Sequence, residues 1–400
     1  MCTLYFVKIP RRNKLQIVLV VIFTVLSVYG AELFLVFNQR AIMGQYMSRE
    51  TKLEKIQELR AAGKKAYPSI YASHLLSGEI PKPVIADRAI LPFAGISNVP
   101  TVLCDEGDGW LVYESDEYGF NNPKGLYRPG LVDVMVVGDS FAHGACVGPD
   151  ENAAALIRKK WPHTLNLGMS ANGFVHEMAT IMEYGPVLKP KTVLWMFYEG
   201  NDLASFGAHL QDDILKKYII QKQFGQNLMD AQDQIDRHYQ SLVDQKLKEG
   251  SLAAGFESVV HLKESIRSIL FLRILRARLG LTRARSEPVE EITENEAAIK
   301  QLLALTRDTV GAWGGRLYFV SLPSWASIQK RGASEAYRSR LFSVVQGQHI
   351  PVINIYEHFI AKKEPRKFFN FPGSHYNKTG YKAVAEKVIS VLEKDLVKED

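Results

Sequence analysis

The segment most able to do chemistry is residues 136–141 (VVGDSF), where an apolar run leads directly into Gly-Asp-Ser. A strand ending in this turn would expose the Ser140 hydroxyl at a sheet edge, and Gly138 would permit the tight backbone there. A serine hydroxyl is a poor nucleophile until an adjacent base removes its proton. Because Asp and Ser are also common turn residues, the motif gains meaning only together with a candidate base.

Three further segments carry polar residues where a predicted strand ends or a predicted helix begins. Residues 166–170 (NLGMS) and 198–202 (YEGND) each end an apolar run, and residues 373–381 (GSHYNKTGY) lead into the last predicted helix. His375, in the third of these segments, is a candidate general base for Ser140.

Together these segments resemble, in order and context, the four sequence blocks of the SGNH, or GDSL-like, hydrolases. The four matching residues are Ser140, Gly168, Asn201 and His375. The resemblance covers about residues 132–392, apart from an insertion, and implies a serine esterase or acyltransferase that needs no cofactor. It implies that Ser140 attacks an ester carbonyl and that His375 carries the proton. It also implies that the N–H groups of Ser140 and Gly168 and the Asn201 amide stabilise the oxyanion.

One departure from the family pattern concerns the acid that orients the histidine. The family commonly has Asp three residues before the catalytic His, but here that position is Pro372. A backbone carbonyl near Pro372 could hold the imidazole instead, or an acid from elsewhere could do so, with Glu199 and Asp202 as candidates. The remaining alternatives are a Ser-His dyad of lower activity and a chain that has lost catalysis.

Short apolar runs alternate with helical patterns through the second half of the chain. The runs are residues 132–137, 164–167, 192–198, 317–322 and 352–355. Such alternation predicts a doubly wound α/β fold with a five-stranded parallel sheet, the SGNH or flavodoxin-like sandwich, with its active site at the carboxyl ends of the strands. Residues 203–288 lack strand signals and predict a helical insertion that could act as a lid, a substrate platform or a membrane-facing piece.

An apolar stretch at residues 15–37 is long enough to cross the hydrocarbon core of a bilayer, about 30 Å thick, with Glu32 as its one charge near the far end. A cleaved signal peptide is the rival, but the apolar run resumes at residues 33–37, which favours an uncleaved anchor. Basic residues crowd the short tail, residues 1–14: Lys8, Arg11, Arg12 and Lys14. They predict a single-pass protein whose main domain lies outside the cytoplasm, in the periplasm if the source is Gram-negative.

The substrate prediction comes from the region between the anchor and the first strand. Residues 38–130 are predicted to be a stalk and lead-in, followed by the hydrolase domain at residues 131–400. Residues 113–123 (YESDEYGFNNP) resemble the leader of some bacterial anchored SGNH-like proteins of cell-surface polysaccharide systems. This favours a carbohydrate O-acyl (acetyl) esterase or O-acetyltransferase. A lipase or lysophospholipase and an inactive polysaccharide-binding scaffold are the alternatives.

Composition excludes several other classes. The net charge of +6 arises from 49 basic and 43 acidic residues that are spread along the chain, which does not indicate nucleic-acid binding. No cluster of residues shows metal-ligand spacing. The three cysteines, Cys2, Cys104 and Cys146, are too few for a disulfide framework. Cys104 and Cys146 can pair only if the domain is exported and their geometry allows it, so free buried thiols are the expectation.

Overall fold

The computed structural model describes residues 10–43, 50–107, 109–221, 223–249, 269–272, 275–276, 288–329 and 331–396. The chain divides into two compact units, residues 1–47 with 257–285 and residues 48–256 with 286–400. The predicted cytoplasmic tail up to residue 9 and most of the predicted insertion from residue 250 to 287 lie outside the described residues.

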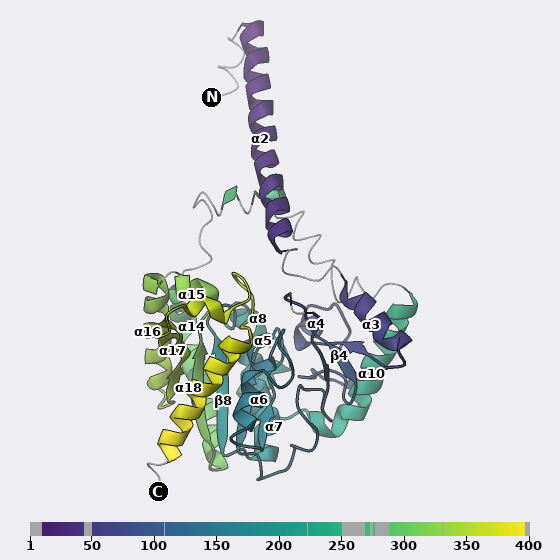
Figure 1. Cartoon of the computed structure of the whole chain (residues 1–400), viewed down its shortest axis with the longest axis vertical. Coiled ribbons are helices and arrows are strands. Elements are labelled where there is room, and N and C mark those ends of the chain that lie inside the picture. Colours follow the sequence, from purple (N-terminus) through teal and green to yellow (C-terminus); the bar gives the residue numbers. More distant parts are fainter. Residues whose placement is uncertain are drawn as a thin grey trace. The chain divides into compact units, whose positions relative to one another are not determined.

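The larger unit is built on a five-stranded parallel sheet with the order β10-β9-β8-β6-β7 (Figure 1). Its strands are β6 (Val134–Gly138), β7 (Thr164–Asn166), β8 (Thr192–Tyr198), β9 (Arg316–Leu322) and β10 (Val352–Asn354). The five predicted strands are all present, so the predicted parallel α/β sheet is confirmed. In chain order the sheet reads 2-1-3-4-5, which is the doubly wound order of flavodoxin-like folds.

The sheet is buried on both faces. Successive residues of a strand point to opposite faces, so Val137 and Trp195 lie in one apolar cluster while Val136 and Met196 lie in another. Burial on both faces is why these strands are nearly continuous apolar runs in the sequence.

Helices supply the apolar partners for both faces. The first cluster includes buried residues of α7 (Phe174–Leu188), α14 (Pro288–Ala312) and α16 (Arg331–Gln346). The second includes residues of α5 (Ser140–His143), α6 (Ala153–Arg158), α15 (Trp325–Gln329), α17 (Ile355–Ile360), the 3-10 helix η1 (Pro365–Phe368) and α18 (Lys378–Leu396). The core of the larger unit is therefore two apolar layers separated by the sheet.

The lead-in region packs onto the first of these layers. It contains α3 (Lys52–Ala61), α4 (Ala72–Leu76), the hairpin of β2 (Val84–Ile85) with β3 (Arg88–Ala89), and a three-stranded sheet of β1 (Tyr67–Pro68), β4 (Pro100–Val102) and β5 (Val112–Glu114). Ile56, Phe93 and Phe120 lie in the same buried cluster as the central strands. Residues 50–130 are thus part of the compact larger unit.

A buried carboxylate ties the lead-in to the sheet. Asp116 accepts hydrogen bonds from the backbone of Tyr118 and Phe120, the amide of Asn122 and the hydroxyl of Tyr127. Asn122 in turn exchanges two 2.8 Å hydrogen bonds with the backbone of Asn166, the last residue of β7. Burial raises the pKa of Asp116 to about 7, against the lowering effect of these donors. The lead-in is therefore fixed at the carboxyl end of an edge strand.

The described part of the predicted insertion is helical. It comprises α8 (Phe206–His209), α9 (Leu215–Ile220) and α10 (Leu228–Lys248), and residues 203–249 contain no strand where they are described. Ile235, Tyr239 and Val243 on α10 lie in the first apolar cluster. This half of the insertion is packed against the larger unit.

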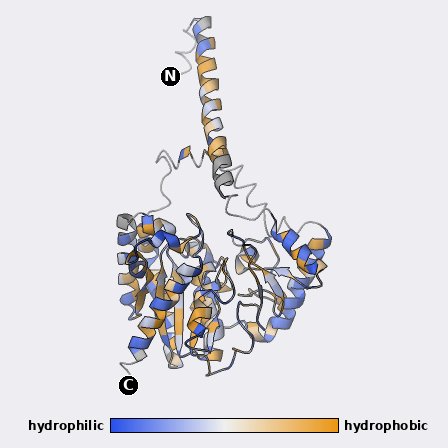
Figure 2. Ribbon diagram, viewed as in Figure 1, coloured by the Kyte–Doolittle hydropathy of each residue, from blue (hydrophilic) through white to orange (hydrophobic). Residues whose placement is uncertain are grey.

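The smaller unit contains α2 (Arg11–Met43), whose apolar section Leu15–Leu35 has 21 residues. Figure 2 shows hydrophobic residues along much of this helix, and large apolar side chains such as Phe23 are exposed. A helix of this length and composition fits a membrane anchor and fits a signal sequence as well.

Candidate active site

Ser140 lies where the central strand β6 turns into the short helix α5. The Asp139 carboxylate caps this turn, because its Oδ1 accepts the Phe141 N–H at 2.9 Å. Gly138 ends the strand, and a Cβ there would lie 2.5 Å from the carbonyl oxygen of Met196 and 2.8 Å from Cβ of Ala142. Only glycine leaves room for the neighbouring strand and for the helix that carries the serine.

His375 reaches this serine from a segment 235 residues later in the chain. Its Nε2 lies 2.8 Å from Oγ of Ser140. Tyr376 anchors this segment to the core, because its buried hydroxyl donates to the carbonyl of Pro323 at 2.6 Å. Asn377 then starts α18, since its Oδ1 accepts the N–H groups of Thr379 and Gly380. The structure thus brings together the predicted nucleophile and base at a distance that allows proton transfer.

Glu106 holds the other side of the imidazole. Its Oε1 lies 2.8 Å from Nδ1 of His375, and its Oε2 accepts the backbone N–H of His375 at 3.0 Å. Both side chains are largely buried, with 13% of Glu106 and 26% of His375 exposed. Ser140, His375 and Glu106 therefore form a continuous hydrogen-bonded triad, which sequence reasoning left incomplete.

The two acids that the sequence suggested for this role are engaged elsewhere. Glu199 accepts hydrogen bonds from Ser321, Ser327 and Arg338. Asp202 accepts the N–H of Tyr198 at 2.6 Å and is fully buried. Neither makes a hydrogen bond to His375 in the described structure, so Glu199 and Asp202 are not the orienting acid. They stabilise the carboxyl end of β8 instead.

The sequence does not indicate Glu106 as the orienting acid, because Glu106 lies 34 residues before Ser140, in a loop of a different sheet. This loop joins β4 to β5, and Asp105 shapes it by accepting the N–H groups of Gly107 and Gly109. The one sequence signal that could have pointed to it is Cys104, two residues earlier. Cys104 forms a disulfide with Cys146, six residues after Ser140, with a Cα–Cα distance of 5.5 Å. The expectation of free thiols was wrong at these two positions.

The cluster at His375 is arranged for hydrogen bonding rather than for a metal. Glu106, Cys146 and His375 each offer a ligand atom within 4.8 Å of one another. However, the Cys146 sulfur is in the disulfide and is not a thiolate, which is the form that binds metals. The remaining carboxylate and imidazole are paired with each other, as a triad requires.

Gly168 is a packing residue in the structure. Its N–H donates to Oδ1 of Asn166 at 2.9 Å and is therefore already committed. A Cβ at this position would lie 2.5 Å from Cβ of Ala142 and 2.6 Å from the backbone nitrogen of His143, so glycine permits close contact with α5. The predicted oxyanion role of the Gly168 N–H does not fit this geometry.

Ala171, three residues later, has the properties that Gly168 lacks. It is exposed and adopts a left-handed backbone with φ 60°, which is uncommon for a residue with a Cβ. Its N–H makes no hydrogen bond within the described part of the chain. Asn201, in the turn after β8, is also exposed, and only its carbonyl is engaged, by the N–H of Ala204. Both residues thus offer uncommitted donors beyond the ends of β7 and β8, the two strands that flank β6.

His143 is a buried structural residue next to the site. Its Nδ1 accepts the N–H of Ser170 at 3.2 Å, so its Nε2 carries the proton and donates to the hydroxyl of Tyr113 at 2.9 Å. Burial, together with a smaller effect of the neighbouring His375, lowers the pKa of His143 to about 3. The imidazole thus stays neutral and links the loop that holds Ala171 to strand β5 of the lead-in.

Asp139, immediately before Ser140, is a buried carboxylate. Burial raises its pKa to about 6, while the Phe141 N–H and the adjacent His375 favour its charged form. Its Oδ2 lies 3.5 Å from Oγ of Ser140, at the limit of a hydrogen bond. Because the better-placed partner of the serine is His375, we assign Asp139 to the turn and not to proton transfer.

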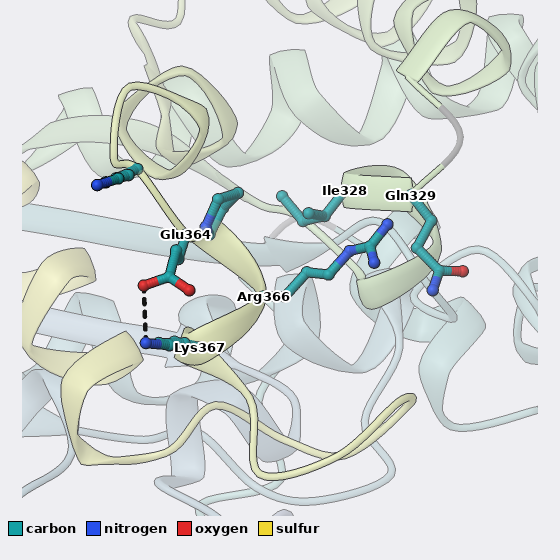
Figure 3. A pocket seen from close by; sticks show the side chains of 7 residues that line it. Ile328, Gln329, Glu364, Arg366 and Lys367 are labelled. Atoms are coloured by element: carbon teal, nitrogen blue, oxygen red, sulfur yellow. Dashed lines mark ion pairs between the residues drawn. The ribbon is translucent and has the colours of Figure 1, made fainter.

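A separate hollow of about 370 Å³ is lined by Ile328, Gln329, Lys363, Glu364, Pro365, Arg366 and Lys367. Figure 3 shows an ion pair between two of these residues, Glu364 and Lys367, with a nitrogen–oxygen distance of 2.7 Å. None of the triad residues lines this hollow, so we place the candidate reaction site at Ser140 and His375.

No protein-family model matches the chain, and the comparison with characterised proteins found no match. Among solved structures, the chain is similar to a member of the lipolytic protein G-D-S-L family from Veillonella parvula, at 14% identity and a TM-score of 0.34, covering 65% of this chain and 97% of that one. It is also similar to a lipase/acylhydrolase from Enterococcus faecalis, at 12% identity and a TM-score of 0.35, covering 66% and 96%. A third similar structure is a GDSL-like lipase from Bacteroides thetaiotaomicron, at 11% identity and a TM-score of 0.35, covering 66% of this chain and 89% of that one. Likenesses at this level carry no argument about chemistry, which we infer from the residues of the site.

The buried state of His143 predicts a specific pH dependence of stability. Its folded pKa, about 3, lies below the usual 6.5, so the unfolded chain binds more protons between these values and stability falls as pH falls through this range. His143→Gln should make this acid-side loss shallower, by up to about 1.4 kcal/mol per pH unit. Urea unfolding of the full chain in detergent between pH 4.5 and 7 measures the slope.

The control for this experiment is His163→Gln, because His163 is exposed in the folded protein. It should leave the slope unchanged. An equal slope for wild type and His143→Gln would show that the buried imidazole does not control acid stability.

Proposed function

We propose that the chain is a membrane-anchored serine hydrolase of the SGNH type that acts as an O-acyl (acetyl) esterase or O-acetyltransferase on carbohydrate esters. The observation that carries this proposal is the hydrogen-bonded line from Ser140 through His375 to Glu106. A nucleophile, a base and an orienting carboxylate in this order are the parts of a serine acyl-transfer mechanism.

The first half of the reaction forms an acyl-enzyme. Oγ of Ser140 attacks the ester carbonyl while Nε2 of His375 takes the hydroxyl proton. Glu106 keeps the other imidazole nitrogen protonated and stabilises the imidazolium that forms. His375 then gives the proton to the leaving alcohol. The acyl group stays on Ser140 until water (hydrolysis) or a sugar hydroxyl (transfer) attacks it.

The oxyanion of this reaction needs donors that are free before the substrate arrives. The family resemblance assigns this role to the Ser140 N–H, the Gly168 N–H and the Asn201 amide. Because the Gly168 N–H already donates to Asn166, we assign the second of these three donor roles to the Ala171 N–H in place of the Gly168 N–H.

A crystal structure with a phosphonate on Ser140 should place the phosphonyl oxygen within about 3 Å of the Ala171 nitrogen. Contact with the Gly168 nitrogen instead would overturn this assignment.

The carbohydrate substrate is supported by the resemblance of residues 113–123 to leaders of polysaccharide-modifying proteins. The geometry explains how such a leader serves the enzyme, because the loop that provides Glu106 belongs to the same lead-in sheet. A lipase or lysophospholipase with the same triad is the alternative. The two differ in the acyl group that they accept, acetyl in the first case and long chains in the second.

The activity can be tested with p-nitrophenyl acetate and the full chain in detergent. Ser140→Ala should reduce turnover to background, since the nucleophile is lost. Glu106→Gln should lower kcat by about 10²–10⁴-fold, because an amide neither fixes the reactive tautomer nor balances the imidazolium charge. Glu114→Gln, at an exposed acid on the same sheet, should have little effect.

Equal turnover by wild type and Ser140→Ala would rule out the serine mechanism. The same assay with p-nitrophenyl butyrate, octanoate and palmitate separates the substrate classes. A carbohydrate O-acetyl enzyme should show kcat/KM falling as the chain lengthens, whereas a rise towards palmitate would favour the lipase alternative.

The proposed location is an uncleaved anchor at residues 15–37 with the larger unit outside the cytoplasm. The Cys104–Cys146 disulfide supports this location, because such bonds persist in oxidising compartments and are rare in the cytosol. Exposed Glu79 provides a site for a topology test. In spheroplasts, a membrane-impermeant maleimide should label Glu79→Cys, whereas Cys2 should be labelled only after lysis. Labelling of Cys2 in intact spheroplasts would reverse the orientation.

A further inference from the structure

The acid and the nucleophile of the triad come from two separate sheets, and a covalent bond joins their loops. Glu106 lies two residues after Cys104 in the β4–β5 loop. Ser140 is the first residue of α5, and Cys146 lies six residues later, just after the end of that helix. Sγ of Cys146 lies 4.0 Å from Nδ1 of His375, the atom that Glu106 contacts. The disulfide is therefore packed against the hydrogen bond between the acid and the base.

The rest of the acid loop contains little that would fix Glu106. At its base, Leu103 and Leu111 pair through their backbones, and Asp105 closes a local turn with Gly107. These hydrogen bonds lie within the loop. Besides the disulfide, its base is joined to the segment after α5 by the apolar packing of Leu103 and Leu111 with Ala145 and Cys146. The described hydrogen bonds of the Glu106 carboxylate all go to His375. Without the disulfide, apolar packing would still hold the base of the loop, but the described hydrogen bonds of the carboxylate itself would be only the two that it makes to His375.

Other contacts hold the lead-in sheet but not this loop. Tyr113 on β5 reaches His143, and Asn121 donates to the carbonyl of His143 at 3.1 Å. Tyr113 lies on β5 and Asn121 follows it, so both contacts are made outside the loop that holds Glu106 and would survive loss of the disulfide. Breaking the bond should therefore leave the fold in place while the acid loop gains freedom.

We propose that the Cys104–Cys146 disulfide is the device that positions Glu106, so that the triad is complete only in the oxidised chain. This inference rests on the proposed function. Under this inference the Cys104–Cys146 disulfide controls the activity of the enzyme as well as the position of Glu106. A chain still in the reducing cytoplasm would carry the serine and the histidine without a fixed acid, and the hydrolase would reach full activity only after export and oxidation.

The redox step involves two electrons and two protons. A dithiol reagent such as dithiothreitol reduces the bond to two thiols and is itself oxidised to a cyclic disulfide. Reoxidation by oxidised glutathione reverses the change. No other group of the site is altered by either reagent, so any change in kcat follows the state of this bond.

The experiment uses the full chain in detergent with Cys2→Ser as the background, which removes the third thiol. Cys104→Ser/Cys146→Ser should lower kcat for p-nitrophenyl acetate by about 10–100-fold with little change in KM, because the acid acts on the chemical step. Adding Glu106→Gln to this double variant should lower kcat only to the level of Glu106→Gln alone, and not by the product of the two separate losses. That non-additivity is the signature of two changes that act through one interaction.

Two controls separate positioning from general damage to the fold. Glu114→Gln combined with the cysteine variants should leave kcat at the level of the cysteine variants alone, since Glu114 is exposed. Reduction of the background protein by dithiothreitol should lower kcat to the level of the cysteine variants, and reoxidation should restore it. This reversible arm keeps the test valid if the serine variants fold poorly.

The outcomes distinguish this inference from the function on which it rests. Wild-type kcat in the cysteine variants, or a loss that multiplies fully with that of Glu106→Gln, would overturn the positioning role while leaving the esterase intact. Equal turnover by the background protein and Ser140→Ala would overturn the proposed function and this inference with it.

Discussion

The structure depends on an imidazole that is held from both sides. His375 contacts Oγ of Ser140 through Nε2 and the Glu106 carboxylate through Nδ1. A histidine with one partner can rotate and exchange tautomers, whereas a histidine between a hydroxyl and a carboxylate presents one basic nitrogen in one direction. The second contact of Glu106, to the backbone of His375, fixes the ring relative to its own chain as well. The segment around Pro372 therefore needs no acid of its own.

This arrangement explains why the lead-in region belongs to the larger unit. An acid supplied from the β4–β5 loop is useful only if that loop keeps its place relative to the main sheet. The Asp116 cluster fixes the lead-in to β7 through Asn122, and the Cys104–Cys146 disulfide fixes it next to the serine. Burying Asp116 is unfavourable, as its raised pKa indicates, but the carboxylate organises a turn that cannot be built from apolar groups.

The other side of the site follows the close packing of β6, α5 and the loop after β7. Gly138 and Gly168 leave room for backbone atoms that any larger residue would meet at 2.5–2.6 Å. In this packed region the Gly168 N–H donates to Asn166, and the donors that remain free are on the exposed residues Ala171 and Asn201. Buried His143 then connects the same loop to the lead-in. Both halves of the candidate site, the proposed proton path and the proposed oxyanion donors, are thus supported by one scaffold on either side of α5.

The sequence by itself determined the parallel sheet, the helices in the described part of the insertion, and the neighbourhood of Ser140 and His375. It could do so because burial on both faces produces apolar runs, and because the carboxyl ends of parallel strands meet at one edge. Tertiary structure alone decided on Glu106 over Glu199 and Asp202, on the pairing of Cys104 with Cys146, and on the commitment of the Gly168 N–H. The first two are contacts between segments that no periodicity connects: the acid lies 269 residues from its histidine, on another sheet. A carboxylate has no local signature that tells which distant group it will face, since that is settled only when the two sheets pack together.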